Sequence, residues 1–143
     1  MLTRFSLNDE SETAQWDAFV ESHPEGSPYH LSCWLRTIQE TYSFKPFMYV
    51  FKNMNGEISG IFPCFRIRNL FAGSRAVSLP FSDQCGPLFH DHHQEKETLA
   101  EIIEEHGKKL SYIEISLPWP PAPLPARRAY RPEGRAYASA SGP

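Results

Sequence analysis

The sequence predicts an α+β domain, in which a mostly antiparallel sheet is flanked by helices and the domain is incomplete at its C-terminal end. Three observations lead to this prediction. Apolar residues recur at helical spacing over residues 31–42, strand-like runs fill residues 45–81, and the composition changes abruptly at residue 118. The 143 residues are enough for one ordinary domain with a buried core.

Composition places the chain among soluble globular proteins. Hydrophobic residues make up 41% and charged residues 22%, and no apolar run approaches the roughly 20 residues that a membrane span needs. Residues 1–7 lack the apolar stretch of a signal peptide. We therefore expect a cytoplasmic protein.

Charge and cysteine content exclude two further classes. Residues 1–117 carry 10 Lys and Arg against 16 Asp and Glu, a net charge of −6, so a broad attraction to DNA is not expected. The three cysteines are an odd number and form no Cys-x-x-Cys pair, which argues against a disulfide framework.

The first half of the chain predicts a short strand and two helices. Residues 2–7 alternate weakly, as in a strand, and Asn8–Ser11 supply capping oxygens and early acids for a helix that buries Trp16 and ends by Pro24. The Ser27-Pro28 pair predicts the start of a second helix, whose apolar stripe runs over residues 31–42 and faces a core.

A strand hairpin follows these helices. Residues 45–52 and 57–68 are predicted to pair antiparallel across the Asn55-Gly56 turn, because these two residues supply the pair of positive φ angles that a tight hairpin turn requires. Pro63 lacks an N–H to donate, so it is expected at an edge or a bulge. Residues 75–81 form a third strand.

The remaining elements are a third helix, a last strand and a tail. Apolar residues from Leu99 to Leu110 predict a helix that ends near Gly107, and residues 111–116 alternate as a strand. Residues 1–117 are therefore read as a partial domain. Residues 118–143 hold 7 of the 13 prolines and are expected to be a disordered Pro/Ala/Arg-rich tail, either frameshift-derived from near residue 116 or a natural linker.

The segment 77–89 is the first candidate for a functional loop. It sets one acid, Asp83, between two apolar runs that Pro80, Gly86 and Pro87 constrain. A carboxylate in an apolar loop can act as an acid or base near neutral pH, which makes Asp83 the candidate catalytic residue. The alternative is a carboxylate that bonds its local backbone in a turn.

Five residues are candidates for substrate binding: Tyr29, His30, Ser82, Gln84 and Gly86. Grouping the first two with the loop around Asp83 is a hypothesis that rests on a family resemblance. The first two open the predicted second helix, where the dipole favours anions, although a packed histidine is the alternative for His30. No metal site is expected, since the four consecutive residues from His90 to His93 seldom converge on one ion. Cys85 is expected to be a structural thiol.

Three stretches resemble FemA/FemB-type aminoacyltransferases, which carry GNAT-like domains, and their exosortase- and envelope-associated relatives. The similarity covers roughly residues 1–116 and is carried by Trp16–Pro24 with Tyr29, His30 and Trp34, by Gly56–Pro63, and by Ser78–Phe81 with Gly86 and Pro87. It implies the first part of a GNAT-like fold.

The resemblance also implies a function. It implies transfer of an acyl or aminoacyl group to an amine of a cell-wall precursor or another envelope acceptor. The acyl-CoA signature of GNAT enzymes is absent from the sequence, so no cofactor is expected, and the full-length protein would use aminoacyl-tRNA or another acyl donor. We expect the chain alone to lack the donor site and to be inactive. Two alternatives are a noncatalytic module that binds an envelope glycan or peptide, and a nonfunctional truncated product that self-associates through an exposed sheet edge.

Overall fold

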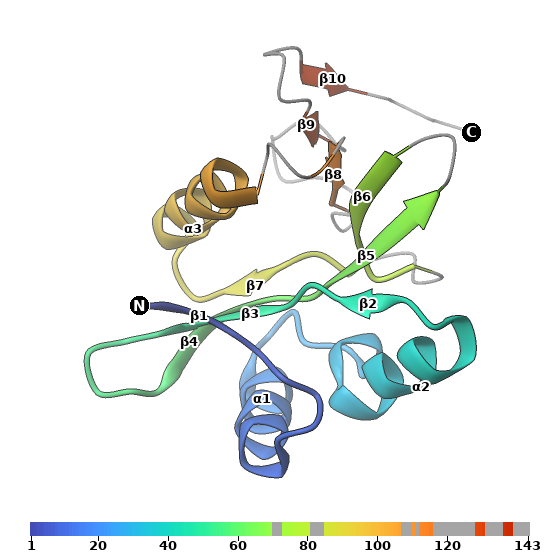
Figure 1. Cartoon of the computed structure of the whole chain (residues 1–143). Coiled ribbons are helices and arrows are strands. Elements are labelled where there is room, and N and C mark those ends of the chain that lie inside the picture. The colour runs from blue at the N-terminus through green and yellow to red at the C-terminus, as the bar shows by residue number, and fades with distance from the viewer. Residues whose placement is uncertain are drawn as a thin grey trace.

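The computed structural model describes residues 1–69, 73–80, 85–106, 110, 112–115, 128–130 and 136–138. These residues form three α-helices and two mostly antiparallel sheets, which confirms the predicted α+β class (Figure 1). The elements in chain order are β1 (Leu2–Arg4), α1 (Glu10–Ser22), the 3-10 turn η1 (Pro28–His30), α2 (Ser32–Tyr42), β2 (Lys45–Pro46), β3 (Tyr49–Lys52), β4 (Ile58–Phe62), β5 (Cys64–Asn69), β6 (Gly73–Ser78), β7 (Leu88–Phe89), α3 (His92–His106), β8 (Tyr112–Glu114), β9 (Arg128–Tyr130) and β10 (Ala136–Ala138).

The chain of the predicted hairpin passes from one sheet to the other: β3 and β4 belong to the smaller sheet, and β2 and β5 to the larger one. The smaller sheet has the order β1-β3-β4-β7, and the larger one has the order β10-β9-β8-β6-β5-β2. Figure 1 shows α1 and α2 on one side of the smaller sheet and α3 on the other. None of the helices in the described part of the chain has the length and hydrophobicity that a bilayer-spanning helix needs.

Helix α1 begins and ends where the sequence predicts. The Asp9 side chain accepts a hydrogen bond from the Glu12 backbone N–H (3.0 Å), and the Glu12 carboxylate accepts one from the Ser6 backbone N–H (3.0 Å). The last residue is Ser22, and the chain turns away at His23, just before Pro24. This helix buries Trp16, which is fully enclosed.

The predicted second helix is divided into two pieces. Residues from Pro28 form the turn η1, Leu31 is extended (φ −65°, ψ 146°), and α2 begins only at Ser32. Asp17 of α1 explains the division, because its carboxylate accepts hydrogen bonds from the Ser32 N–H (2.7 Å) and hydroxyl (2.6 Å). A side chain from another helix thus satisfies the first turn of α2.

The predicted hairpin is confirmed, but both of its strands are divided between the sheets. Only Gly56 of the predicted pair has a positive φ (83°), so the prediction is wrong for Asn55. The Asn53 side chain shapes the turn instead, because it accepts hydrogen bonds from the N–H groups of Asn55 and Glu57 (2.9 and 3.0 Å). Strand β3 pairs with β4 in one sheet, and β2 pairs with β5 in the other. Pro63 lies between β4 and β5, where the chain passes from one sheet to the next. Its missing N–H therefore falls outside both strands.

Three strands differ from the sequence prediction. The prediction missed β7, which pairs two residues with β4. It also placed no regular structure after residue 116, whereas β9 pairs antiparallel with β8 and β10 with β9. Backbone groups at the open side of β8 can accept a partner strand whatever its side chains, which is why composition did not reveal this pairing. Apart from these six residues, the Pro/Ala/Arg-rich tail lies outside the described residues.

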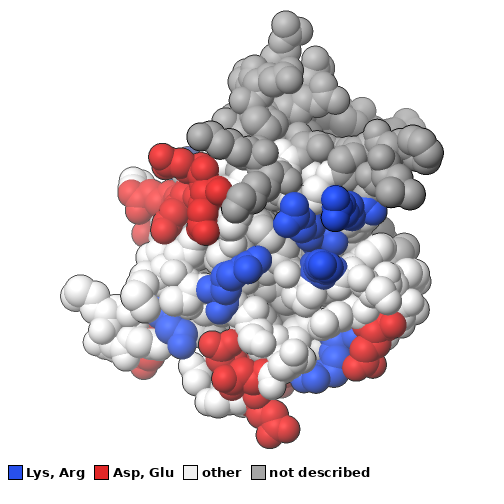
Figure 2. Space-filling view, in the orientation of Figure 1, with Lys and Arg blue, Asp and Glu red and all other residues white. Residues whose placement is uncertain are grey.

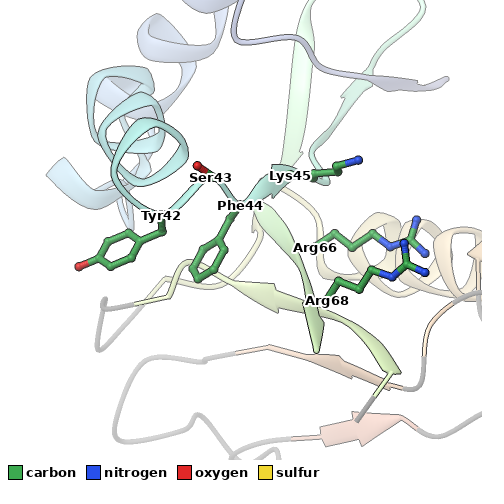
Figure 3. A pocket seen from close by; sticks show the side chains of 6 residues that line it. All are labelled: Tyr42, Ser43, Phe44, Lys45, Arg66 and Arg68. Carbon is green, nitrogen blue, oxygen red and sulfur yellow. The ribbon is translucent and has the colours of Figure 1, made fainter. Parts of the chain in front are cut away.

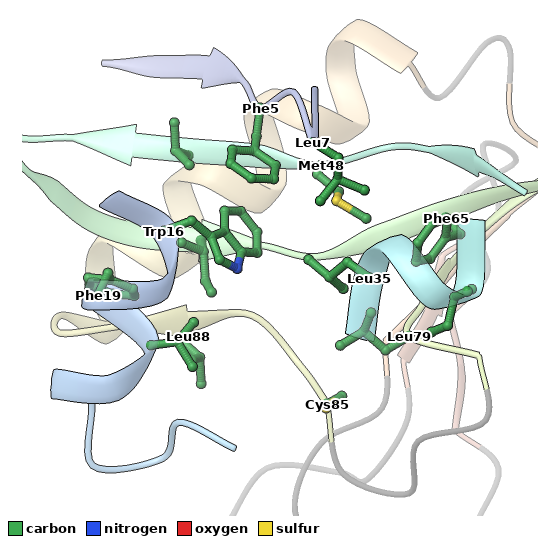
Figure 4. Packing of buried hydrophobic residues seen from close by; sticks show 14 residues of the cluster. Phe5, Leu7, Trp16, Phe19, Leu35, Met48, Phe65, Leu79, Cys85 and Leu88 are labelled. Atoms are coloured by element: carbon green, nitrogen blue, oxygen red, sulfur yellow. The ribbon is translucent and has the colours of Figure 1, made fainter. Parts of the chain in front are cut away.

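Two apolar clusters stabilise the fold. The first lies between the sheets and helices α1 and α2, with Trp16 stacked on Phe5 at a centroid distance of 4.2 Å (Figure 4). The second lies under α3 and includes Phe62 and Ile102. The stripe over residues 31–42 was predicted to face a core, and Leu35 and Ile38 are buried in the first cluster.

Candidate functional site

His30 is the centre of a buried hydrogen-bond cluster. Its imidazole is only 1% exposed, with Nε2 3.1 Å from the Gly86 carbonyl oxygen and Nδ1 2.8 Å from the Ser27 hydroxyl. A carbonyl oxygen can only accept, so Nε2 carries the hydrogen, and Nδ1 accepts from Ser27. Burial lowers the pKa of His30, and this outweighs the opposing effect of the bond to Gly86. The neutral imidazole therefore links η1 to Gly86, which directly follows residues 80–85 of the candidate loop.

A second hydrogen bond, from helix α1, fixes the backbone of η1. The indole Nε1 of Trp16 donates a hydrogen bond of 2.8 Å to the His30 carbonyl oxygen. Helix α1, the η1 turn and the segment at Gly86 are thus joined through one histidine residue. This chain of bonds positions the end of the candidate loop against the first apolar cluster.

Cys85 lies beside the same histidine. Its Sγ is 3.8 Å from His30 Nδ1 and 3.7 Å from the Ser27 hydroxyl oxygen, and the residue is fully buried. The sequence analysis found no histidine partner for Cys85, because 55 residues separate the two. A thiol without solvent access cannot meet a substrate, so its position fits the expected structural role.

The loop is constrained at its other end too. Leu79, which is 1% exposed, has φ 37°, a left-handed conformation that costs a non-glycine residue roughly 1–2 kcal/mol. Strain of this kind persists only where surrounding packing enforces it. Buried Leu79 before the loop and the His30–Gly86 bond after it therefore hold both ends of residues 80–85.

The predicted site residues fall into three groups. His30 and Gly86 are brought together, as a buried contact between side chain and backbone. Tyr29 is 45% exposed, and its ring makes an edge-on contact with Trp34 at 5.7 Å between ring centroids. Ser82, Asp83 and Gln84 lie outside the described residues, so their roles stay predictions.

The structure also reveals a pocket that the sequence analysis did not single out. It measures about 330 Å³ and lies where α2, β2 and β5 meet (Figure 3). Its described lining consists of Tyr42, Ser43, Phe44, Lys45, Arg66 and Arg68. Lys45 of β2 and Arg66 of β5 are 21 positions apart in the sequence, so only strand register could have indicated that these cations lie close together.

Metal-ligating side chains do not converge within the described ranges, where no three His, Cys, Asp or Glu residues form a group suited to an ion. His90 stacks on His23 at 5.0 Å between ring centroids, and His93 lies 3.4 Å from Glu97 on the exposed side of α3. These contacts divide the His90–His93 segment between two different environments.

Comparison with known proteins gives an informative match among solved structures. No family model matches the sequence, and no curated protein matches it either. Among solved structures, the crystal structure of FemX superposes with a TM-score of 0.54 over 81% of this chain, at 17% sequence identity. The fold is FemX-like. At this identity the match establishes the fold alone, and it confirms the predicted FemA/FemB-type GNAT-like fold.

The extent of the match differs between the two proteins. The chain spans about a quarter of the FemX chain, because the superposition covers 27% of it. The His30 cluster and the pocket therefore lie in a chain that corresponds to about a quarter of FemX.

Proposed function

We propose that this chain forms the acceptor-binding part of a Fem-type acyl- or aminoacyl-transferase that acts on a cell-envelope acceptor, with a cell-wall precursor as the first candidate. The FemX-like fold carries the proposal. The anchored ends of the loop after β6 support it, because a binding loop needs rigid attachment to its scaffold. The proposed location is the cytoplasmic side of the inner membrane.

Asp83 is proposed to bind and deprotonate the acceptor amine. Acyl transfer to nitrogen requires the amine to lose its proton before or during attack, and a carboxylate in an apolar loop suits this task. Ser82 and Gln84 flank it and offer a hydroxyl and an amide for hydrogen bonds to the acceptor. His30 acts through the loop, since its own ring nitrogens already bond Gly86 and Ser27.

The donor side is proposed to lie in another polypeptide or another part of the protein. The match covers 27% of FemX, and the sequence holds no acyl-CoA signature. We therefore propose that the chain binds the acceptor but does not catalyse transfer by itself, with aminoacyl-tRNA or another acyl donor bound elsewhere.

The test is acceptor binding by the 143-residue chain. Fluorescence anisotropy would measure the affinity for a labelled peptidoglycan stem peptide with a free side-chain amine. Asp83→Asn is expected to weaken binding by about tenfold or more, since it removes a charged hydrogen-bond partner of the ammonium group. Glu101→Gln, which neutralises an exposed acid on α3, serves as the control and should leave the affinity unchanged.

Three results would contradict the proposal. Equal affinity of wild-type and Asp83→Asn chains would remove Asp83 from the site, and no binding of the stem peptide would remove the acceptor class. A transfer product formed by the chain with aminoacyl-tRNA alone would contradict the assignment of the donor site to another part.

A noncatalytic binding module is the second candidate. The small share of FemX that is matched favours it, because a module of this size can recognise an envelope peptide without any donor site. Peptide binding that persists while no added donor-binding partner restores transfer would support the module. A truncated product without function would bind no peptide and would self-associate through its sheet edges.

A further inference from the structure

We propose that one face of the domain binds the same face of a second copy of this chain through two patches of opposite charge. The cationic row consists of three residues of the larger sheet: Lys45, Arg66 and Arg68. The acidic stripe consists of three residues of helix α3: Glu97, Glu101 and Glu104. Together the two patches make the face self-complementary, so the expected assembly is a twofold dimer.

Strand register places the cationic row on the side of the larger sheet that α3 covers. Arg66 lies opposite Ala76 in the β5–β6 pair, and Ala76 belongs to the apolar cluster under α3. Residues two apart on a strand share a face, so Arg68 lies on the same side, and Lys45 is paired directly with Arg66. Figure 3 shows the three cationic side chains extending to one side, away from the aromatic rings of the pocket. The row therefore continues the face that begins under α3.

Two of the three cations lack a carboxylate partner. Lys45 and Arg68 are exposed, and in the described part of the chain neither forms an ion pair. Arg66 is held in place, because its Nε donates a hydrogen bond of 2.6 Å to the Ser74 hydroxyl. Like charges that face each other across neighbouring strands are unfavourable. A partner that brings carboxylates to this row therefore relieves the repulsion.

The acidic stripe lies on the outer side of α3. Glu97, Glu101 and Glu104 are exposed and recur at spacings of four and three residues, which places them on one side of the helix. Ile102, on the other side, is buried against the sheet. Glu97 lies 3.4 Å from exposed His93, and the other two acids form no ion pair within the described ranges. Like charges at this spacing repel one another, so the helix also gains stability when cations approach.

Both patches are visible on one face of the molecule. Figure 2 shows the acids over α3 and, apart from them, Lys and Arg side chains gathered over the β2 and β5 part of the same face. A helix that lies on a sheet rises by about 10 Å, its diameter with side chains. A twofold axis between two copies, perpendicular to the line that joins the patches, brings each raised α3 over the cationic row of the other copy. Charge and height are then complementary at both contacts.

The mixed charge of this face argues against two other kinds of partner. Nucleic acids and anionic bilayers attract cations but repel acids, and the acidic stripe lies on the same face as the cationic row. Residues 1–117 also carry a net charge of −6. A second copy of the chain matches both patches at once.

This interface is separate from the proposed acceptor loop. Leu79 and Cys85, at the two ends of that loop, are buried in the first apolar cluster, which α1 and α2 cover. The cationic row and the acidic stripe lie on the α3 side of the sheets. The inference therefore does not rest on the proposed function.

The first experiment measures association of the wild-type chain by sedimentation equilibrium at two ionic strengths. Salt screens exposed charges, so the dissociation constant of the dimer is expected to rise about tenfold or more between about 0.01 M and about 0.15 M NaCl, as the Debye length falls from about 30 Å to about 8 Å. Association that salt does not change, as expected for open sheet edges, would overturn the proposal. A chain that stays monomeric throughout, or that grows beyond dimers with increasing concentration, would overturn it too.

The second experiment reverses each patch in turn and then mixes the two variants. Glu97→Lys with Glu104→Lys makes both patches positive, and Lys45→Glu with Arg68→Glu makes both patches negative. Each variant alone should have a dissociation constant raised by about tenfold or more, because like charges then face each other at both contacts. An equimolar mixture should form heterodimers with nearly wild-type affinity, since opposite charges face each other again.

A matched control separates the interface from net charge. Glu21→Lys with Glu40→Lys makes the same change in net charge as the α3 variant, but at exposed positions of α1 and α2. It should change the dissociation constant far less, because these positions lie on the other side of the sheets. Thermal unfolding checks that every variant is folded.

Three outcomes of the variant series would overturn the proposal. The first is a mixture of folded variants that stays monomeric. The second is an equal loss of association in the α3 variant and in the control. The third is a monomeric wild-type chain that binds phosphatidylglycerol vesicles and loses this binding with Lys45→Glu and Arg68→Glu, which would assign the cationic row to an anionic lipid surface.

Discussion

At the scale of single residues, the candidate substrate-binding residue His30 connects two segments of the fold through hydrogen bonds. Its sequence position at the start of a helix indicated an anion contact, but the imidazole bonds the Gly86 carbonyl and the Ser27 hydroxyl instead. Sequence reasoning weighed a packed histidine as the alternative, and the structure has the side chain buried. It could not name the partner, because a contact across 56 residues depends on how the two segments pack.

The lowered pKa of His30 predicts a pH dependence of stability. The unfolded chain takes up a proton near pH 6.5, while the buried imidazole resists protonation, so the free energy of unfolding should fall as the pH drops below about 6.5. Above that pH neither state binds the proton, and this contribution is fully present. Chemical denaturation from pH 7.5 to 5.5 would measure the slope.

The variant His30→Gln isolates this effect. It should be less stable than wild type at pH 7.5 by about 1–3 kcal/mol, the range for disturbing a buried polar contact, and the difference should shrink toward pH 5.5. His93→Gln on the exposed side of α3 should follow the wild-type curve. If His30→Gln and wild type gave parallel curves, protonation of His30 would not govern the slope.

At the scale of elements, close packing decides positions that propensity leaves open. Gly60 of β4 lies opposite Phe89 of β7, and a Cβ added at Gly60 would come within 2.2 Å of the Phe89 ring. Glycine weakens a strand interior, so sequence reasoning alone gives no reason for it here. The approach of the Phe89 ring supplies the reason, and β7 was itself missed because it is only two residues long.

Gly60→Ala should therefore destabilise the fold. The Phe89 ring must move away from the new methyl group, and overpacking of this kind costs about 1–3 kcal/mol. Urea denaturation would measure the loss of stability. Ser59→Ala, at the neighbouring position of the same strand, should cost less, since its hydroxyl makes only long hydrogen bonds of 3.4 and 3.2 Å. If Gly60→Ala left the free energy of unfolding unchanged, the Phe89 ring would be able to move away from the new methyl group without cost.

At the scale of the whole molecule, the tail takes part in the larger sheet. Strand β9 covers the side of β8 that faces away from β6, with Tyr130 registered against Ile113, and β10 then forms the sheet edge. The proposal of a partial domain thus has a structural consequence. Without these residues β8 would itself be an edge with unpaired backbone groups.

Truncation tests this consequence. A chain that ends at residue 117 should self-associate more strongly with increasing concentration than the 143-residue chain, because β8 then offers an open edge. Sedimentation velocity over a concentration series would measure the association. Identical behaviour of the two chains would show that β9 and β10 do not protect β8.

Local chemistry made several features of this protein predictable. The helix cap within Asn8–Ser11, the turn at Asn55-Gly56 and the end of α3 near Gly107 depend on residues close in sequence. All three lie where they were expected, although only Gly56 of the turn has the positive φ that was predicted for both residues. The FemA/FemB-type fold was also predicted from short stretches of similar sequence, and the FemX superposition confirms it.

Tertiary structure decided the features that join distant segments. The division of each hairpin strand between two sheets, the His30–Gly86 bond and the gathering of Lys45, Arg66 and Arg68 all depend on how elements pack and in which register strands pair. Capping and turn formation are determined within a few residues, so sequence by itself determined them. Burial and cross-strand contact are properties of the folded chain, and only the structure could assign them.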